Sequence, residues 1–269
     1  MKTKNIRLST ELAFEYEFGK PKEKGKIISE TFYDKKGNTS KHIDYYIHID
    51  NQVIQYEVLY DKNGKDIEWK EFDEQGNFFS NTVRKYDKDG LKTEELFYNS
   101  KNELEYKTIY TYKDKKVTEK NKLDVNGNLL ERTLNTYDTN GLDTKWITYG
   151  ANGLLERKVV LNYNDNGDTT EMLFYRHSGE SSRLEMKYDD DFNMIEEFHF
   201  NKDGKIEQRE TWKYYGKGKE QERIIYNEEG KIDIKFDYEY DKEGKLLRIR
   251  ESNDSGEPNF LTVFEEEYY

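Results

Sequence analysis

The stretch YDKEGKLLRI, from Tyr240 to Ile249, decides the fold because its first five residues recur along most of the chain. The same pentad returns as YDKNG at Tyr60, YDKDG at Tyr86 and YDTNG at Tyr137. Its aspartate can accept a backbone N–H two residues on, and its glycine can take the left-handed conformation that closes a turn. A type I turn followed by such a glycine is a three-residue hairpin loop with a G1 bulge. Each pentad therefore predicts a β-hairpin corner.

The corners recur at alternating intervals. Tyr60, Phe72, Tyr86 and Tyr98 are 12, 14 and 12 residues apart, and the pattern continues to Ser252. One short and one long interval make a double unit of about 26 residues, and such a period is typical of a repeat protein. The residue that precedes each turn is called its anchor below, and most anchors are tyrosine or phenylalanine.

Three corners depart from the pentad but keep to the same rule. Asn102 stands where glycine is expected, and asparagine tolerates the left-handed conformation well. The turn after Tyr112 has no glycine and is one residue shorter, as if a loop residue were deleted. Phe192 occupies the glycine position after Tyr188, and a loop shifted by one residue would use Asn193 instead.

This spacing leaves roughly nine or ten residues for each strand and predicts an all-β fold. The expected architecture is a continuous antiparallel β-meander of about 18–20 strands, built from tandem 12/14-residue hairpin repeats. Because strands twist, a sheet of that width should form an elongated coiled or spiral sheet. The predicted organisation is an N-terminal lead-in (1–25), a tandem β-hairpin repeat domain (26–257) and a C-terminal strand or tail (258–269).

The three-residue loop also predicts which side chains meet. Each anchor should lie opposite the residue two positions after the glycine, on the same face of the sheet. The predicted pairs include Phe72 with Phe78, Tyr163 with Thr169, Phe200 with Ile206, and Tyr240 with Leu246. Because the intervals of 12 and 14 are even, all anchors are expected on one face, in two rows.

Composition limits the kind of partner. The 269-residue chain has a formal charge of −12, so a nucleic acid would dock against net repulsion while a basic protein would be attracted. There is no cysteine, no apolar run of signal-peptide length and no stretch long enough for a membrane span. We therefore expect a cytoplasmic protein without membrane insertion, or a secreted one if a signal peptide has been removed.

The segments YDKDGLKTEEL, YDTNGL and YDKEGKLLRI resemble the tyrosine–aspartate (YD) repeats of bacterial Rhs proteins and teneurins. The resemblance covers about residues 33–256 and implies a β-hairpin repeat scaffold that winds into a spiral sheet. The corners are closer together here than in a typical YD unit, and the basic residue after glycine is lysine or absent. The short NGK-containing repeats are similar to those of YwqK-like antitoxin proteins. Neither resemblance implies an enzymatic activity.

Possible metal and catalytic motifs have structural explanations. Four turns resemble calcium loops but lack the further ligands that calcium needs; they begin at Asp61, Asp87, Asp124 and Asp138. The four histidines are interpreted as surface residues: His42, His48, His177 and His199. No nucleophile elbow, phosphate loop or HExxH motif occurs. We therefore expect no enzymatic activity, no catalytic residue, no cofactor and no metal site.

Aromatic side chains are the remaining candidates for a binding surface, because tyrosine and tryptophan rings can stack on sugars. The candidates are Trp69, Tyr106, Tyr110, Trp146, Trp212 and Tyr238. The alternative interpretation is that these rings form the buried face of the sheet itself.

Two functional hypotheses follow from the sequence. The first is a non-enzymatic protein-interaction scaffold, with an immunity or antitoxin-type protein that binds a basic partner protein as its concrete version. The second is a carbohydrate-binding or surface-adhesion module that uses the aromatic rows. The partner, the oligomeric state and any signal peptide cannot be read from the residues.

Overall fold

The computed structural model describes residues 6–45, 53–61, 63–73, 75–177 and 179–268, and every regular element in these ranges is a β-strand. The strands are β1 (Ile6–Glu17), β2 (Lys20–Pro21), β3 (Lys26–Tyr33), β4 (Thr39–Tyr45), β5 (Val53–Tyr60), β6 (Asp66–Phe72), β7 (Phe78–Tyr86), β8 (Lys92–Tyr98), β9 (Leu104–Lys113), β10 (Lys116–Asp124), β11 (Leu129–Tyr137), β12 (Asp143–Gly150), β13 (Leu155–Tyr163), β14 (Thr169–Arg176), β15 (Gly179–Tyr188), β16 (Met194–Asn201), β17 (Ile206–Gly216), β18 (Lys219–Tyr226), β19 (Ile232–Tyr240), β20 (Leu246–Ser252) and β21 (Pro258–Tyr268). The prediction of an all-β meander with hairpin corners is confirmed.

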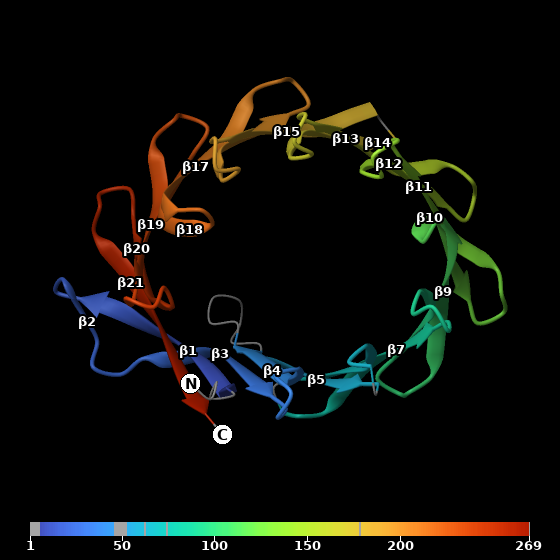
Figure 1. Ribbon diagram of the computed structural model, residues 1–269, viewed down its shortest axis with the longest axis horizontal. Helices are drawn as coiled ribbons and strands as arrows, with labels where there is room; N and C mark the ends of the chain where they lie inside the picture. The colour runs from blue at the N-terminus through green and yellow to red at the C-terminus, as the bar shows by residue number, and fades with distance from the viewer. Residues whose placement is uncertain (1–5, 46–52, 62, 74, 178, 269) are drawn as a thin grey trace. The chain divides into compact units, whose positions relative to one another are not determined.

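The prediction that the sheet stays open as a coil or spiral is wrong. Strands that follow each other in sequence pair from β3 to β21, and β21 pairs with β1, which also pairs with β3. Figure 1 shows β1 and β21 side by side. Twenty strands, β1 and β3 to β21, therefore form one closed sheet, a β-barrel, and the short β2 is an extra strand on β1. Closure is favoured because it gives partners to the backbone groups of both outer strands.

The chain divides into two compact units. Unit 1 comprises residues 1–111, 121–129 and 261–269, and unit 2 comprises residues 112–120 and 130–260. The predicted lead-in contains β1 and β2, and residues 258–268 form β21. Among the described residues the buried apolar side chains are few: Val58 and Leu96 in unit 1, and Val159, Leu161 and Trp212 in unit 2. Most side chains are half-buried, as in a single sheet layer.

The corners have the predicted turn chemistry. In the corner after Tyr60, the Gly64 N–H donates to the Asp61 carbonyl (3.0 Å) and the Asp61 N–H donates to the Lys65 carbonyl (2.7 Å). The Asp61 carboxylate accepts from the N–H groups of Asn63 (2.8 Å) and Lys65 (2.9 Å). These hydrogen bonds, led by the one from Lys65, hold the pKa of Asp61 below its ordinary value. The aspartate of the pentad is therefore a structural residue.

At the corner after Tyr188, the sequence left open whether Phe192 or Asn193 takes the glycine position. Phe192 itself adopts φ 65° and its N–H donates to the Asp189 carbonyl (3.1 Å), so the loop does not shift to Asn193. Asn102 adopts φ 60°, as predicted for its glycine position. The short turn after Tyr112 has left-handed Asp114 (φ 52°) and Lys115 (φ 63°), the conformation of a two-residue type I′ turn.

The four predicted pairs are confirmed, but the prediction that all anchors share one face is wrong. Phe72 lies opposite Phe78, Tyr163 opposite Thr169, Phe200 opposite Ile206, and Tyr240 opposite Leu246. Beside each of these pairs the register shifts by one residue. This shift is a second bulge, additional to the G1 bulge of the turn, and it lies in the strand that follows the turn. Each such bulge reverses the alternation of side chains, so an even interval places the next anchor on the opposite face.

Tyr60 and Phe72 show the reversal. Tyr60 pairs with Asp66, but Leu59 pairs with Glu68, so one residue of β6 is bulged. Phe72 lies opposite Gln55, five positions before Tyr60 on the same strand and therefore on the other face. Anchors at one edge of the sheet thus lie on one face, and anchors at the other edge lie on the opposite face. We call the face that carries Tyr86 in unit 1 and Tyr163 in unit 2 the tyrosine face of that unit.

The anchors of the tyrosine face form a hydrogen-bonded series that we call the tyrosine ladder. The hydroxyl of Tyr163 donates to the carbonyl of Asp143 (2.6 Å), which is the residue opposite the preceding ladder anchor, Tyr137. The other rungs are Tyr86 to Asp66 (3.0 Å), Tyr137 to Val117 (2.7 Å), Tyr188 to Thr169 (2.8 Å) and Tyr214 to Met194 (2.7 Å). Each rung ties one hairpin to the next hairpin along the same edge, which explains why tyrosine recurs there.

The ladder predicts a loss of stability in alkali. Burial, followed by the hydrogen bond to Asp66, raises the pKa of Tyr86 to about 12. Burial and the charges of Glu220 and Asp189 raise the pKa of Tyr214 to about 12. An unfolded tyrosine ionises near pH 10. These two phenols should therefore stabilise the fold below about pH 10, and this stabilisation should be lost as the pH rises toward about 12.

Urea unfolding followed at several pH values from 9 to 12, with phenolate absorbance at 295 nm as a second signal, checks this prediction. The double variant Y86F/Y214F should lose less stability over the same pH range. Ionisation of all tyrosines of the folded protein near pH 10 would contradict it.

Candidate functional site

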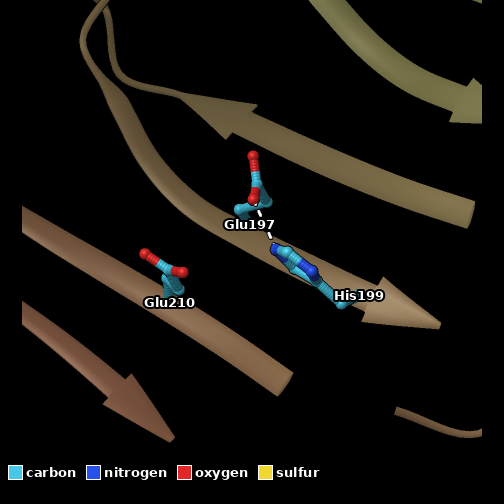
Figure 2. A group of neighbouring side chains, drawn as sticks. All are labelled: Glu197, His199 and Glu210. Carbon is cyan, nitrogen blue, oxygen red and sulfur yellow. Dashed lines mark hydrogen bonds and ion pairs between the residues drawn. The ribbon is translucent and has the colours of Figure 1, made fainter. Parts of the chain in front are cut away.

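The densest group of potential ligands lies on the tyrosine face of unit 2, where β16 and β17 pair. Glu197 and His199 are two residues apart on β16 and so point to the same side, and Glu210 on β17 lies directly opposite Glu197. Nε2 of His199 is 2.6 Å from Oε1 of Glu197. One ligand atom from each of the three residues can be chosen so that all lie within 4.8 Å of one another. Figure 2 shows Glu210 on the strand that neighbours the one carrying Glu197 and His199.

Outer contacts hold the Glu210 carboxylate in place. Glu210 is only 5% exposed. Oε1 accepts from Nε2 of Gln208 (2.6 Å), and Oε2 accepts from Nε of Arg223 (2.8 Å). The Arg223 guanidinium also lies over the rings of Trp212 (5.6 Å) and Phe236 (5.7 Å). Burial is the largest single influence on the pKa of Arg223 and lowers it, but the hydrogen bond and charge of Glu210, with the charges of Tyr238 and Glu220, together raise it by more, so the net shift is upward.

The charges of this group do not balance. Glu197 and Glu210 each carry one negative charge when ionised, and Arg223 supplies one positive charge. With a neutral His199 the group therefore has one excess negative charge on a half-buried face. Like charges directly opposite each other on paired strands are destabilising. A cation placed between Glu197, His199 and Glu210 would offset this repulsion.

The predicted aromatic candidates lie on the tyrosine face of their units. Trp69, Tyr106 and Tyr110 do so in unit 1, as the register of β5 to β9 requires. Trp146, Trp212 and Tyr238 do so in unit 2. The tyrosine face therefore gathers three candidates in each unit.

Neighbouring charged side chains cover several of these rings. The Arg84 guanidinium lies 5.1 Å from the ring centroid of Trp69, and the Lys122 ammonium lies 3.7 Å from that of Tyr106. The Tyr106 ring also stacks on Phe97, with ring centroids 4.7 Å apart. Trp212 is 9% exposed beneath Arg223. Burial and a hydrogen bond with Glu220 raise the pKa of Tyr238. These rings are integrated into the sheet by their contacts, and sugar stacking on them stays a prediction.

The other sequence candidates are dispersed. His42 contacts the Thr31 hydroxyl through Nδ1 (2.8 Å), His177 is exposed, and His48 lies outside the described residues. In the four turns that resemble calcium loops, the first aspartate accepts backbone N–H groups of its own corner. Among the residues that the structure describes, only Glu197, His199 and Glu210 form a group with metal-ligand proximity.

This group was not predicted from the sequence, where His199 was interpreted as a surface residue. The one available signal is the spacing Glu-x-His at Glu197 and His199, which places both side chains on the same face of a strand. The partner strand supplies Glu210 only through the observed register. That register depends on the bulge beside Phe200, which the sequence did not predict.

A second feature of unit 2 is a run of three neighbouring corners at the ladder edge, which we call the acidic corners: residues 138–142, 164–168 and 189–193. They carry six carboxylates and no Lys or Arg: Asp138, Asp165, Asp168, Asp189, Asp190 and Asp191. Hollows of about 700 Å³ and about 530 Å³ lie between successive corners of this run. In the described part of the chain, the one cation lining these hollows is Lys187, which pairs with Glu196 at 2.7 Å.

The comparisons with known proteins identify no family. No family model and no curated protein match the chain. Among solved structures, a porin-like protein from Bacteroides uniformis is 8% identical with a TM-score of 0.41, and covers 97% of this chain and 98% of its own. A porin-like protein from Bacteroides vulgatus is 9% identical with a TM-score of 0.31, and covers 78% and 93% respectively. At TM-scores this low, the likenesses carry no argument about activity.

A third similar structure is the Photorhabdus luminescens Tc holotoxin pore, which is 12% identical with a TM-score of 0.24. The alignment covers 87% of this chain but only 19% of the toxin chain.

The predicted location is not kept. A cytoplasmic protein without membrane insertion was expected, but the sheet closes into a β-barrel and porin-like proteins are among the similar structures. The immunity-type interpretation depended on that location and is not kept. A chain of short strands contains no long apolar segment, so the lack of one does not establish where the protein acts. Within the described residues, no helix has the length and apolar character needed to cross a membrane.

Proposed function

We propose that this protein is a non-enzymatic binding scaffold that holds a basic partner protein against the acidic corners of unit 2. The observation that carries the proposal is the concentration of six carboxylates without a Lys or Arg on three successive corners. A lysine- or arginine-rich surface would be attracted to these corners and held there by several charge-assisted hydrogen bonds.

The carboxylates of the acidic corners divide into two roles. Asp138 and Asp189 accept backbone N–H groups of their own turns, and Asp168 accepts from Nδ2 of Asn164 (3.0 Å), so these three build the corners. Asp165, Asp190 and Asp191 are exposed, and their side chains have no partner among the described residues. The latter three are therefore available to a ligand without loss of a turn.

Neighbouring corners of the same edge differ in charge. The next corner along this edge carries Lys217 and Lys219 without a carboxylate, and the one after it balances Asp241 and Glu243 with Lys242 and Lys245. The excess of negative charge is thus local to three corners, which favours a partner of matching size over general attraction to the whole protein. The alternative of a carbohydrate-binding module is less well supported because Lys and Arg side chains cover several of the aromatic rings it would use.

Neutralising the three exposed carboxylates should weaken the binding of a basic probe. Exposed ion pairs contribute about 0.2–1 kcal/mol each. The triple variant D165N/D190N/D191N should therefore bind a fluorescent deca-lysine peptide about tenfold more weakly in low salt, as measured by anisotropy. Added salt should reduce the difference between the variant and the unmodified protein.

A matched control separates the acidic corners from the overall charge. The variant D203N/E228Q/D254N changes the net charge equally, at exposed corner positions of the opposite edge of unit 2. It should bind the peptide nearly as well as the unmodified protein. Equal weakening by both triple variants would contradict the proposal, because it would mean that only net charge matters.

A further inference from the structure

We propose that Glu197, His199 and Glu210 bind one divalent transition-metal ion of the zinc class. The three residues offer one imidazole nitrogen and two carboxylate oxygens, a donor set that zinc and related ions accept. The proposal is independent of the acidic corners, which lie at the edge of the sheet and contribute no side chain to this group.

The backbone places the three ligands around a common point. Glu197 and His199 share one side of β16, and the register sets Glu210 opposite Glu197 and Gln208 opposite His199. The chosen ligand atoms lie within 4.8 Å of one another. Zinc bonds to nitrogen and oxygen are about 2.0–2.2 Å long, so the side chains need to close by about 1 Å around an ion. Rotation of the half-buried Glu197 and His199 side chains can supply that movement without a change of register.

The surrounding hydrogen bonds are those that metal ligands usually have. Carboxylates that bind metals are generally oriented by outer hydrogen bonds, and here Gln208 and Arg223 donate to the two oxygens of Glu210. A carboxylate has about four lone-pair positions, so these two bonds leave room for a metal. Arg223 is itself held between Glu210 and the Trp212 and Phe236 rings. Glu210 is thus held rigidly, and Glu197 and His199 are the more exposed ligands that close on the ion.

Electrostatics favours a cation at this point over an empty group. Arg223 neutralises one of the two glutamates, and the remaining negative charge lies beside the His199 ring. A bound ion replaces the hydrogen bond between His199 and Glu197 by two coordinate bonds. It also removes the repulsion between the opposed Glu197 and Glu210 carboxylates.

Titration with Zn²⁺ in a calorimeter tests the proposal. The unmodified protein should bind one tight equivalent of Zn²⁺ per chain and melt at a higher temperature in its presence. The variants H199A and E197Q should bind Zn²⁺ more than about 100-fold more weakly. The variant Q208A, which removes only an outer hydrogen bond to Glu210, should weaken binding roughly 10- to 100-fold.

Two controls exclude other sites and misfolding. The variants H177A and D165N/D190N/D191N should keep the tight equivalent, because neither changes the three ligands. Circular dichroism and melting without metal establish that H199A and E197Q are folded, and E197Q is the milder change if H199A is not. Absence of a tight equivalent in the unmodified protein, or its full retention in folded E197Q, would overturn the proposal.

Discussion

Deletion of residues 258–269 is expected to open the closed sheet of twenty strands and make the protein self-associate. This segment contains β21, which pairs with β1. Its loss leaves β1 and β20 with a row of unpaired backbone N–H and C=O groups, and such edges pair readily with other chains. Size-exclusion chromatography with light scattering should detect larger species, and the melting transition should broaden or disappear.

A change at β2 provides the control for this deletion. Replacing Lys20 and Pro21 by glycine disrupts a two-residue strand that lies outside the twenty strands of the closed sheet. That variant should keep the mass and the melting temperature of the unmodified protein. If the truncated chain also kept both properties, pairing of β21 with β1 would not be needed for the fold.

Removing three rungs of the tyrosine ladder should cause the next largest effect. The variant Y163F/Y188F/Y214F keeps the rings but loses three hydrogen bonds of 2.6–2.8 Å to backbone carbonyls. Each bond contributes about 1 kcal/mol, and the sites are far enough apart for their effects to add to about 3 kcal/mol. Chemical unfolding should report this loss, together with a fall in melting temperature of about 5–10 °C.

The opposite edge of unit 2 offers a matched triple variant. Tyr149, Tyr175 and Tyr226 are anchors there, and the structure gives their hydroxyl groups no ladder bond. Y149F/Y175F/Y226F changes the same number of hydroxyl groups and should cost much less than the ladder variant. Equal losses from the two triples would mean that the ladder bonds contribute nothing specific.

The corners were predictable because their chemistry is local. An aspartate or asparagine, a left-handed residue four positions after the anchor and the anchor itself lie within five residues, and their hydrogen bonds close within the turn. Even Asn102 and Phe192, which replace glycine, adopt the left-handed conformation that their position demands. Strand number, antiparallel order and the four anchor pairs follow directly from these corners.

The faces of the sheet were not predictable from the corners. The second bulge, in the returning strand, has no fixed residue type: it falls at Ile67 after Tyr60, at Phe79 after Phe72 and at Thr170 after Tyr163. Its effect is large because a shift of one residue exchanges the faces of all the side chains that follow. The even intervals therefore gave the wrong prediction of a single shared face, and anchors of the two edges lie on opposite faces.

The same bulge decides the candidate metal site. If β16 and β17 continued from the Phe200–Ile206 pair without a bulge, Glu197 would lie opposite Arg209 and form an ordinary salt bridge with it. The observed shift between His199 and Phe200 instead places Glu197 opposite Glu210. Two carboxylates and a histidine then meet where the sequence alone predicts a neutral pair. The acidic corners, in contrast, can be read directly from the residues once the corners are located.

The sequence by itself determined the repeat, the corners, the antiparallel order and the negative charge, because each depends on residues close together in the chain. Only the tertiary structure decided the closure of the sheet, the face of each side chain and the meeting of Glu197, His199 and Glu210. Closure joins β1 to β21, strands from opposite ends of the chain, and faces depend on register shifts accumulated over many strands. Such properties are set by the pairing of whole strands, and no single turn motif encodes them.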